Sequence, residues 1–187
     1  MARLVYSIIS SLDGYVADRD GNFDWAAPDE EVHAFVNDSE RPIGTYLFGR
    51  RMYETMKVWE TMATADEPPV VSDFASIWKS ADKVVYSRTL DEGSVDTSRT
   101  RLERGFDPAA VARLKEAAAR DVTVGGPGLA GQALRAGLVD ACRVIAVPVI
   151  VGGGTRTWPD DVRVDLAVRD VHRFRNGFVA FDYDVVG

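Results

Sequence analysis

A glycine-rich stretch, Val122–Leu129, has the composition of a site that could hold an anion. Its sequence, V-T-V-G-G-P-G-L, runs from strand-favouring residues into a tight turn, and good helix formers follow. Glycine lets the backbone adopt a positive φ and lets another molecule approach closely. The free N–H groups of a helix's first turn can bind an anion such as a pyrophosphate. A plain turn between two buried elements is an equal alternative, because the stretch lacks the G-x-G-x-x-G pattern of dinucleotide-binding folds.

Two other predicted strands end in polar and basic residues, namely Gly49, Arg50, Arg51, Ser87 and Arg88. Arginines in the first turn of a helix are unfavourable beside the positive end of the macrodipole unless they meet an anion. The alternative is that they point into solvent or pair with a nearby acid such as Glu54. In a parallel α/β sheet the carboxyl ends of the strands share one edge, where ligands bind. Together these segments would suit a nucleotide that carries a pyrophosphate and a further phosphate.

A second glycine run, Gly152–Gly154, follows an apolar segment. One interpretation is a loop that comes close to a ligand, and the other is an unstructured connection. We favour the first.

Three acids near Trp25 are candidates for a proton donor: Asp24, Glu30 and Glu31. A carboxyl group in an apolar cleft has a raised pKa and can donate a proton at neutral pH. For Glu30 and Glu31 the alternative is a solvated acid in a helix's first turn. Other reactive side chains are assigned structural roles: Asp13 in its own turn, His33 in surface or helix packing, and Cys142 as a buried thiol.

Alternating strand and helix patterns must position these residues. The apolar run Leu4–Ile9 predicts a central strand at the start of the chain, and helices are predicted at Met52–Trp59 and Ala109–Arg120. Alternating apolar residues on both sides of Asn176-Gly177 predict a C-terminal β-hairpin. Without a repeat or a linker, residues 1–187 are expected to form one α/β domain with a mostly parallel sheet and an antiparallel edge.

Composition excludes several classes of function. The 187 residues are 46% hydrophobic and 27% charged, which is ordinary for a soluble globular protein. A net charge of -7 argues against binding to nucleic acid or to an anionic membrane. One cysteine and two distant histidines give no internal disulfide framework and no metal-site spacing. The opening apolar run is too short for a signal sequence or a membrane span, so we expect a cytoplasmic protein. From the spacing of cysteine and histidine we expect no bound metal.

The order of short motifs resembles that of a known group of proteins. The motifs are S-L-D-G-Y, D-W, F-G-R-R-M-Y-E, V-V-Y-S-R, V-G-G-P-G-L, G-L-V-D and P-V-I-V-G-G-G. This series, which spans nearly the whole chain, is similar to the dihydrofolate reductase-like superfamily. Within it, the reductase (C-terminal) domain of the bifunctional riboflavin-biosynthesis deaminase–reductase and its stand-alone relatives are the closest match. The resemblance implies a three-layer α/β sandwich with about eight strands and helices on both faces, and NADPH as the cofactor.

The resemblance also implies roles for individual positions. Phosphates on the adenosine side would lie at Gly49, Arg50 and Arg51, and the adenine ribose with its 2′-phosphate at Ser87 and Arg88. The pyrophosphate would be cradled by Gly125, Gly126, Pro127, Gly128 and Leu129. Ala17 would lie near the nicotinamide ring, with Asp18–Trp25 as a lid.

The chain departs from folate-reducing relatives at three points. Met52 stands where they have Thr, Ala130 replaces an aromatic residue, and no arginine lies between Arg51 and Arg88. These departures argue against folate as the substrate. We expect an NADPH-dependent reductase that transfers hydride to a small pyrimidine- or pterin-like heterocycle. The alternative is a non-catalytic NADP(H)- or nucleotide-binding protein that serves as a sensor or assembly module. The resemblance also suggests a homodimer formed through the sheet edge or the C-terminal hairpin.

Overall fold

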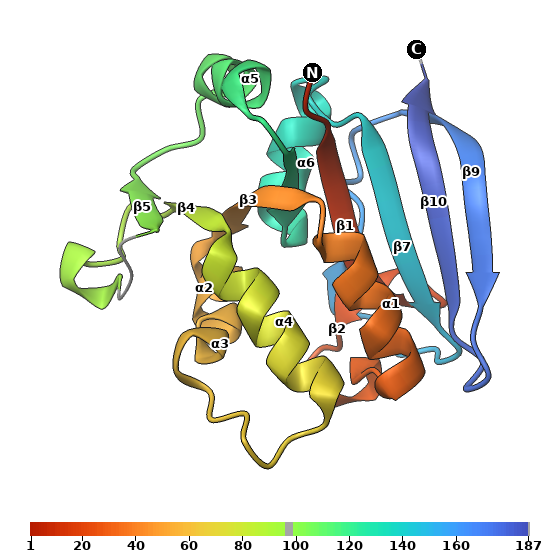
Figure 1. The fold of residues 1–187 in the computed structure, drawn as a ribbon. Coiled ribbons are helices and arrows are strands. Elements are labelled where there is room, and N and C mark those ends of the chain that lie inside the picture. The colour runs from red at the N-terminus through yellow and green to blue at the C-terminus, as the bar shows by residue number, and fades with distance from the viewer. Residues whose placement is uncertain (96–98, 187) are drawn as a thin grey trace.

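A central eight-stranded sheet organises the computed structural model, which describes residues 1–95 and 99–186 (Figure 1). Its strands are β1 (Leu4–Ser11), β3 (Ile43–Gly49), β4 (Asp82–Tyr86), β5 (Thr100–Glu103), β6 (Asp121–Gly125), β7 (Ala141–Val147), β9 (Asp165–Arg173) and β10 (Val179–Val186). They lie in the order β5-β4-β3-β6-β1-β7-β10-β9, and a separate pair is formed by β2 (Tyr15–Ala17) and β8 (Thr155–Arg156). Neighbours from β5 to β7 are parallel, whereas β10 is antiparallel to both β7 and β9. The predicted mostly parallel sheet with an antiparallel C-terminal hairpin is confirmed.

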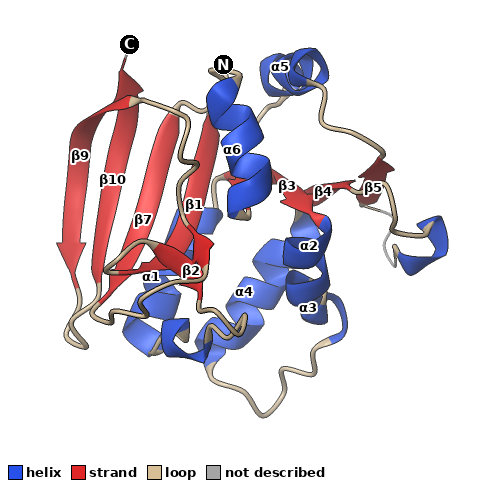
Figure 2. Ribbon diagram, turned by 180° about the vertical axis from the view of Figure 1, so that it is seen from behind, coloured by secondary structure: helices blue, strands red, loops and turns tan. Residues whose placement is uncertain are grey.

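Helices cover both faces of this sheet, as the two opposite views show (Figures 1 and 2). They are α1 (Glu30–Glu40), α2 (Arg50–Met56), α3 (Val58–Thr61), α4 (Pro69–Ser80), α5 (Pro108–Ala117) and α6 (Pro127–Arg135), with 3-10 turns η1 (Asp24–Ala26) and η2 (Glu92–Ser94). Residues of α5 and α6 share one apolar cluster with the sheet, while α1, α2 and α4 contribute to clusters on the other face. The three-layer arrangement is therefore confirmed. In the described part of the chain, no helix has the length and apolar character that a membrane crossing requires.

Burial on both faces explains why the central strands are apolar throughout. In β3, Leu47 joins the cluster under α6, whereas Tyr46 and Phe48 point to the opposite cluster under α4. In β1, Leu4 and Tyr6 are fully buried in the cluster under α6. Parallel strands covered by helices on both sides need apolar residues at consecutive positions, which is the pattern that the sequence has.

Two helices differ in length from the prediction. The helix expected at Met52–Trp59 is interrupted at Lys57, so that α2 and α3 are separate. Glu60 in α3 accepts a hydrogen bond from Trp78 Nε1 at 2.8 Å and pairs with the buried Lys83 at 3.0 Å, which fixes α3 against α4. The Ala-rich helix α5 ends at Ala117, because the chain must already turn into β6.

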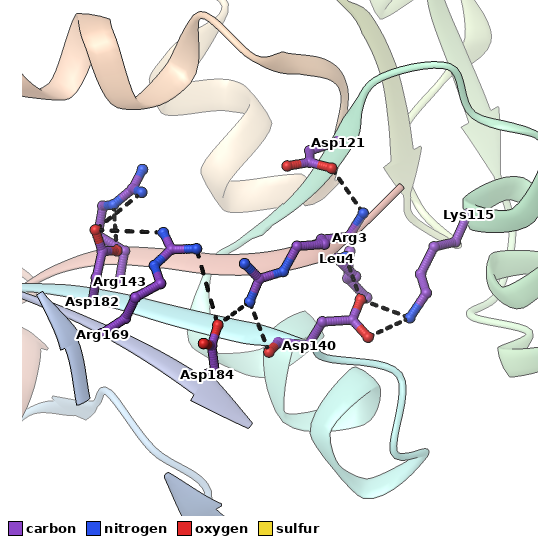
Figure 3. A network of polar contacts seen from close by, with 9 residues as sticks. All are labelled: Arg3, Leu4, Lys115, Asp121, Asp140, Arg143, Arg169, Asp182 and Asp184. Atoms are coloured by element: carbon purple, nitrogen blue, oxygen red, sulfur yellow. Dashed lines mark hydrogen bonds and ion pairs between the residues drawn. The ribbon is translucent and has the colours of Figure 1, made fainter. Parts of the chain in front are cut away.

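Ion pairs fasten the C-terminal hairpin to the parallel part of the sheet (Figure 3). Arg143 of β7 and Asp182 of β10 pair at 2.8 Å with both side chains largely buried, and Arg3 pairs with Asp184. The predicted hairpin turn is also confirmed, with Gly177 at φ 90°. The antiparallel edge is therefore held by charge pairs as well as by strand hydrogen bonds.

Candidate functional site

The predicted binding segments converge because their strands are neighbours. Strand β3 lies between β4 and β6, with Phe48 opposite Gly125 and Gly49 opposite Tyr86. Ser87 follows β4 directly. The carboxyl ends of the three strands therefore meet at one edge, and α2 and α6 both begin there (Figure 2).

The first two glycines of the turn after β6 are explained by the protein itself, Gly125 by packing and Gly126 by its backbone conformation. A Cβ on Gly125 would come within 2.4 Å of Phe48 Cε1, and a Cβ on Gly126 would lie 3.4 Å from Met52 Cβ. Gly126 also has a φ of +85°, which side chains rarely adopt. Gly128 is different, since it is exposed and no atom lies within 4 Å of the Cβ that it could carry. Space is therefore open beside Gly128.

The start of α6 has the features of an anion-binding helix end. No side chain of the described residues caps this helix, and the first helical position is Pro127, which has no N–H. The Ala130 N–H bonds to the Gly126 carbonyl at 3.0 Å, so the N–H groups of Gly128 and Leu129 precede the first intrahelical bond. These two donors and the helix dipole favour an anion at this position. Helix α2 has only seven residues, so it contributes to the candidate site mainly through the side chains of Arg50 and Arg51.

The three arginines of the neighbouring strand ends differ in their surroundings. Arg50 pairs with Glu54 at 2.8 Å and donates a hydrogen bond to Thr89 Oγ1 at 3.0 Å, so the alternative of an acidic partner holds for this residue. Arg51 and Arg88 are exposed and form no ion pair within the described residues. Thr89 was not among the predicted site residues. The only feature of the sequence that could have indicated it is its position directly after Ser87 and Arg88. Thr89 links α2 to the end of β4.

Ser87 shapes the turn that carries Arg88. Its buried hydroxyl oxygen accepts hydrogen bonds from the N–H groups of Thr89, at 3.2 Å, and Leu90, at 3.0 Å. Such a Ser turn replaces a backbone hydrogen bond and fixes the local conformation. The hydroxyl of Ser87 thus has a structural role in this turn.

Ala17 lies in the small β2–β8 pair beside the end of β1 (Figure 2). The run Gly152–Gly154 packs against this segment, since a Cβ on Gly154 would fall 2.0 Å from the Ala17 carbonyl oxygen. All three glycines have a positive φ. Contact with the chain itself accounts for Gly153 and Gly154, and the positive φ accounts for Gly152. The expectation that this run directly approaches a ligand is therefore not needed to explain its composition.

The candidate proton donors Asp24 and Glu30 are both exposed. Trp25, next to Asp24, turns inward and packs against the cluster that contains Val32. Glu31, the third candidate, accepts a hydrogen bond from the Arg175 N–H at 3.2 Å. Neither Asp24 nor Glu30 is therefore enclosed by apolar residues in this structure.

The remaining reactive side chains have packing roles. His33 lies against the rings of Trp59 and Phe74, and burial lowers its pKa. For the Cys142 thiol, whose charged form is the deprotonated one, burial instead raises the pKa, to about 11. Asp13 does more than stabilise its own turn, because its carboxylate accepts hydrogen bonds from the N–H groups of Val151 and Gly152.

A cavity of about 600 Å³ lies away from this edge, between α5 and the beginnings of β4 and β5. Its lining includes Thr45, Asp82, Arg101 and Leu114 but none of the predicted site residues. The predicted site is thus an exposed edge of the sheet and is not part of this cavity.

Comparison with known proteins agrees with this architecture. An uncharacterized Bacillus subtilis protein, YyaP, is 27% identical over 97% of this chain and 94% of its own length. The crystal structure of a putative riboflavin biosynthesis protein from Shewanella sp. PV-4 superposes with a TM-score of 0.74 at 22% identity, with full coverage of both chains.

Two further solved structures share the fold. One is a pyrimidine reductase-like protein from Corynebacterium diphtheriae, with a TM-score of 0.71 at 13% identity, covering all of this chain and 92% of the other. The second is the diaminohydroxyphosphoribosylaminopyrimidine deaminase/5-amino-6-(5-phosphoribosylamino)uracil reductase of Thermotoga maritima. It has a TM-score of 0.69 at 15% identity, and the match covers 99% of this chain but 57% of that protein. The RibD C-terminal domain model matches residues 2–179, and the chain therefore belongs to the RibD C-terminal domain family.

Proposed function

We propose that the protein is an NADPH-dependent reductase that transfers hydride to a small heterocyclic substrate. The single observation that carries the proposal is the meeting, at one sheet edge, of the uncapped start of α6 with the arginines after β3 and β4. Membership of the RibD C-terminal domain family, which has reductases among its structural relatives, supports the same reaction class.

The residues at this edge fit a phosphorylated dinucleotide. The N–H groups of Gly128 and Leu129 have no side-chain cap to displace, and open space lies beside Gly128. Arg51 and Arg88 carry positive charge without an acidic partner among the described residues, which matches a phosphate dianion. Gly125, Gly126 and Pro127 would shape the pyrophosphate cradle.

Three further residues, Gly49, Arg50 and Ser87, would contribute to cofactor binding at the adenosine end of the proposed site. Arg50 is held by Glu54 and Thr89, so we assign the 2′-phosphate to Arg51 and Arg88 and a supporting role to Arg50. Ala17 would border the nicotinamide ring. Bound NADPH supplies the hydride.

The family and the departures in sequence support the substrate class that we propose. A relative described as pyrimidine reductase-like and a relative that reduces an aminouracil favour a pyrimidine-like heterocycle, with a pterin as the second choice. Asp24 and Glu30 are our candidates for the group that delivers a proton to a ring nitrogen. A closing movement of Asp18–Trp25 would have to remove them from water, because both are exposed.

Titration with NADPH, followed by a turnover screen, tests the proposal. Calorimetry should detect NADPH binding, and absorbance should show cofactor oxidation with at least one member of a panel of amino-pyrimidines and pterins. Asp24→Asn and Glu30→Gln variants should then separate the two candidate acids. A proton donor acts only while it is protonated, so loss of the true donor removes the fall in rate on the alkaline side of the pH–rate profile. Absence of NADPH binding would refute the proposal.

A non-catalytic NADP(H)-binding protein is the second candidate. The exposure of Asp24 and Glu30 favours it, because a reductase needs a proton donor that is protected from water. Binding of NADPH without turnover across the panel would support this candidate over the enzyme.

We also propose a homodimer through the β9 edge. All nine residues of β9 are exposed, and the strand has β10 on one side only. Val168 is 61% exposed and Val171 50% exposed, although apolar residues on an edge strand promote pairing with another chain. Sedimentation velocity should show a dimer, and Val168→Lys should shift it toward the monomer. A wild-type monomer at high concentration would contradict this assignment.

A further inference from the structure

We propose that Asp13 is a positioning residue that fixes the nicotinamide end of the site by joining the turn after β1 to the glycine loop after β7. The inference rests on the proposed function. In this proposal Asp13 does not contact cofactor or substrate. It acts by holding Ala17 in position.

The carboxylate of Asp13 links two segments that are far apart in sequence, the turn at Ser11–Tyr15 and the loop at Val151–Gly152. Its Oδ2 accepts a hydrogen bond from the Gly152 N–H at 2.8 Å, and its Oδ1 accepts from the Val151 N–H at 3.1 Å and from the Ser11 hydroxyl at 2.7 Å. The Ser11 oxygen in turn accepts from the Tyr15 N–H at 2.9 Å. We call this set of four hydrogen bonds the Asp13 clamp.

The charge state of Asp13 agrees with this geometry. Desolvation acts to raise the pKa of its carboxyl, but the hydrogen bonds from Ser11, Gly152 and Val151 outweigh that effect and lower it. The carboxyl is consequently ionised at neutral pH, and both of its oxygens act as acceptors.

The glycine loop transmits the position of the clamp to Ala17. Gly154 lies so close to the chain that a Cβ would fall 2.0 Å from the Ala17 carbonyl oxygen and 2.5 Å from the Asp18 carbonyl carbon. In the β2–β8 pair, Ala17 is opposite Thr155. A shift of the loop at Gly152 must therefore move Ala17 or open this contact.

Two further bonds make the loop and the turn one unit. Arg19 donates a hydrogen bond to the Gly152 carbonyl at 3.0 Å, and the Thr157 N–H donates to the Gly14 carbonyl at 2.9 Å. The buried hydroxyls of Thr157 and Ser10 are 2.6 Å apart, which ties the end of the loop to β1. The clamp thus connects a glycine-rich loop, which by itself would be mobile, to a rigid strand.

The adenosine end of the proposed site is built from other elements. Arg51 follows β3, Arg88 follows β4 and Gly128 opens α6, whereas the clamp joins only the segments 11–19 and 151–157. Loss of the clamp should therefore affect the nicotinamide end and spare the adenosine end.

Comparison of two probes tests this separation: NADPH, which spans the whole site, and adenosine 2′,5′-bisphosphate, which has no nicotinamide. Asp13→Asn keeps the shape of the side chain but cannot accept from Gly152 and Val151 with a full carboxylate. The Kd of this variant for NADPH should rise about tenfold, while its Kd for the bisphosphate stays at the wild-type value. Asp66→Asn is the matched control, because Asp66 is exposed and its carboxylate accepts no hydrogen bond from the described residues.

Ser11→Ala provides a second, milder variant if Asp13→Asn folds poorly. It removes one donor to the carboxylate and should weaken NADPH in the same direction by a smaller factor. Equal losses for the two probes, or no loss for either, would overturn the positioning role. A wild-type protein that binds neither probe gives a different result, since it refutes the proposed function itself and this inference with it.

Discussion

Phe48 and Gly125 face each other on β3 and β6, and the ring of Phe48 occupies the space that a side chain at position 125 would need. A Cβ there would come within 2.4 Å of ring atom Cε1 and 2.7 Å of Cδ1. The same ring stacks on Trp78 of α4, with 5.7 Å between the ring centroids, so it has little freedom to move. Packing of Phe48 in the core therefore leaves no room for a side chain at the start of the glycine turn.

Gly125→Ala should destabilise the protein because of this contact. We expect a loss of about 1–3 kcal/mol in the free energy of unfolding, the usual cost of overpacking a core, measured by urea denaturation. Gly128→Ala is the matched control, since position 128 is open and alanine favours a helix. An equal effect of the two substitutions would show that the Phe48 contact does not decide the residue at position 125.

Charge at the start of α6 should control cofactor binding. Gly128→Asp places a carboxylate where we propose the pyrophosphate, and it should weaken NADPH and NADH alike by at least about tenfold. The helix itself should not lose stability, because an acid in the first turn is favourable there. Calorimetric titration of Gly128→Asp beside Gly128→Ala separates charge from size. Unchanged binding by the Asp variant would remove the pyrophosphate from this helix end.

The preference for NADPH over NADH should depend on two arginines. The double variant Arg51→Ala with Arg88→Ala should weaken NADPH far more than NADH, since only NADPH carries the 2′-phosphate. Arg163→Ala is a suitable control, as its side chain is 89% exposed and pairs only with Asp165 within the described residues. Equal losses for both cofactors would refute the assignment of the 2′-phosphate.

A buried acid should make stability depend on pH. Glu40 at the end of α1 is buried, and desolvation raises its pKa, while Arg143 and the hydroxyls of Tyr46 and Ser7 act in the opposite direction. Because the pKa is higher in the folded state, the contribution of Glu40 to stability is full below its unfolded pKa, about 4.3, and is lost as the pH rises through the folded value.

Glu40→Gln tests this dependence. The variant should be more stable than wild type at neutral pH by roughly 1–3 kcal/mol, and the difference should vanish below about pH 4. Urea denaturation across this pH range measures it. A difference that is constant with pH would show that Glu40 does not titrate between the two states.

The sequence by itself determined the alternation of strands and helices, the central position of the first strand and the C-terminal hairpin. Apolar runs and turn residues are local signals, so Leu4–Ile9 and Asn176-Gly177 could be interpreted without a partner. The motif order also identified the family and its fold. The candidate cofactor residues could be named in the same way, and their roles stay predictions until a ligand is tested.

Contacts between distant segments were decided only by the tertiary structure. Asp13 and Val151 are 138 positions apart, and nothing near Asp13 indicates that its carboxylate binds that loop. The reasons for Gly125 and Gly154 likewise lie in Phe48 and Ala17, which only strand register and loop packing bring near. A hydrogen bond or a steric contact depends on positions within a few tenths of an ångström. Such precision arises from the packing of the whole chain, whereas local sequence fixes only which element each residue joins.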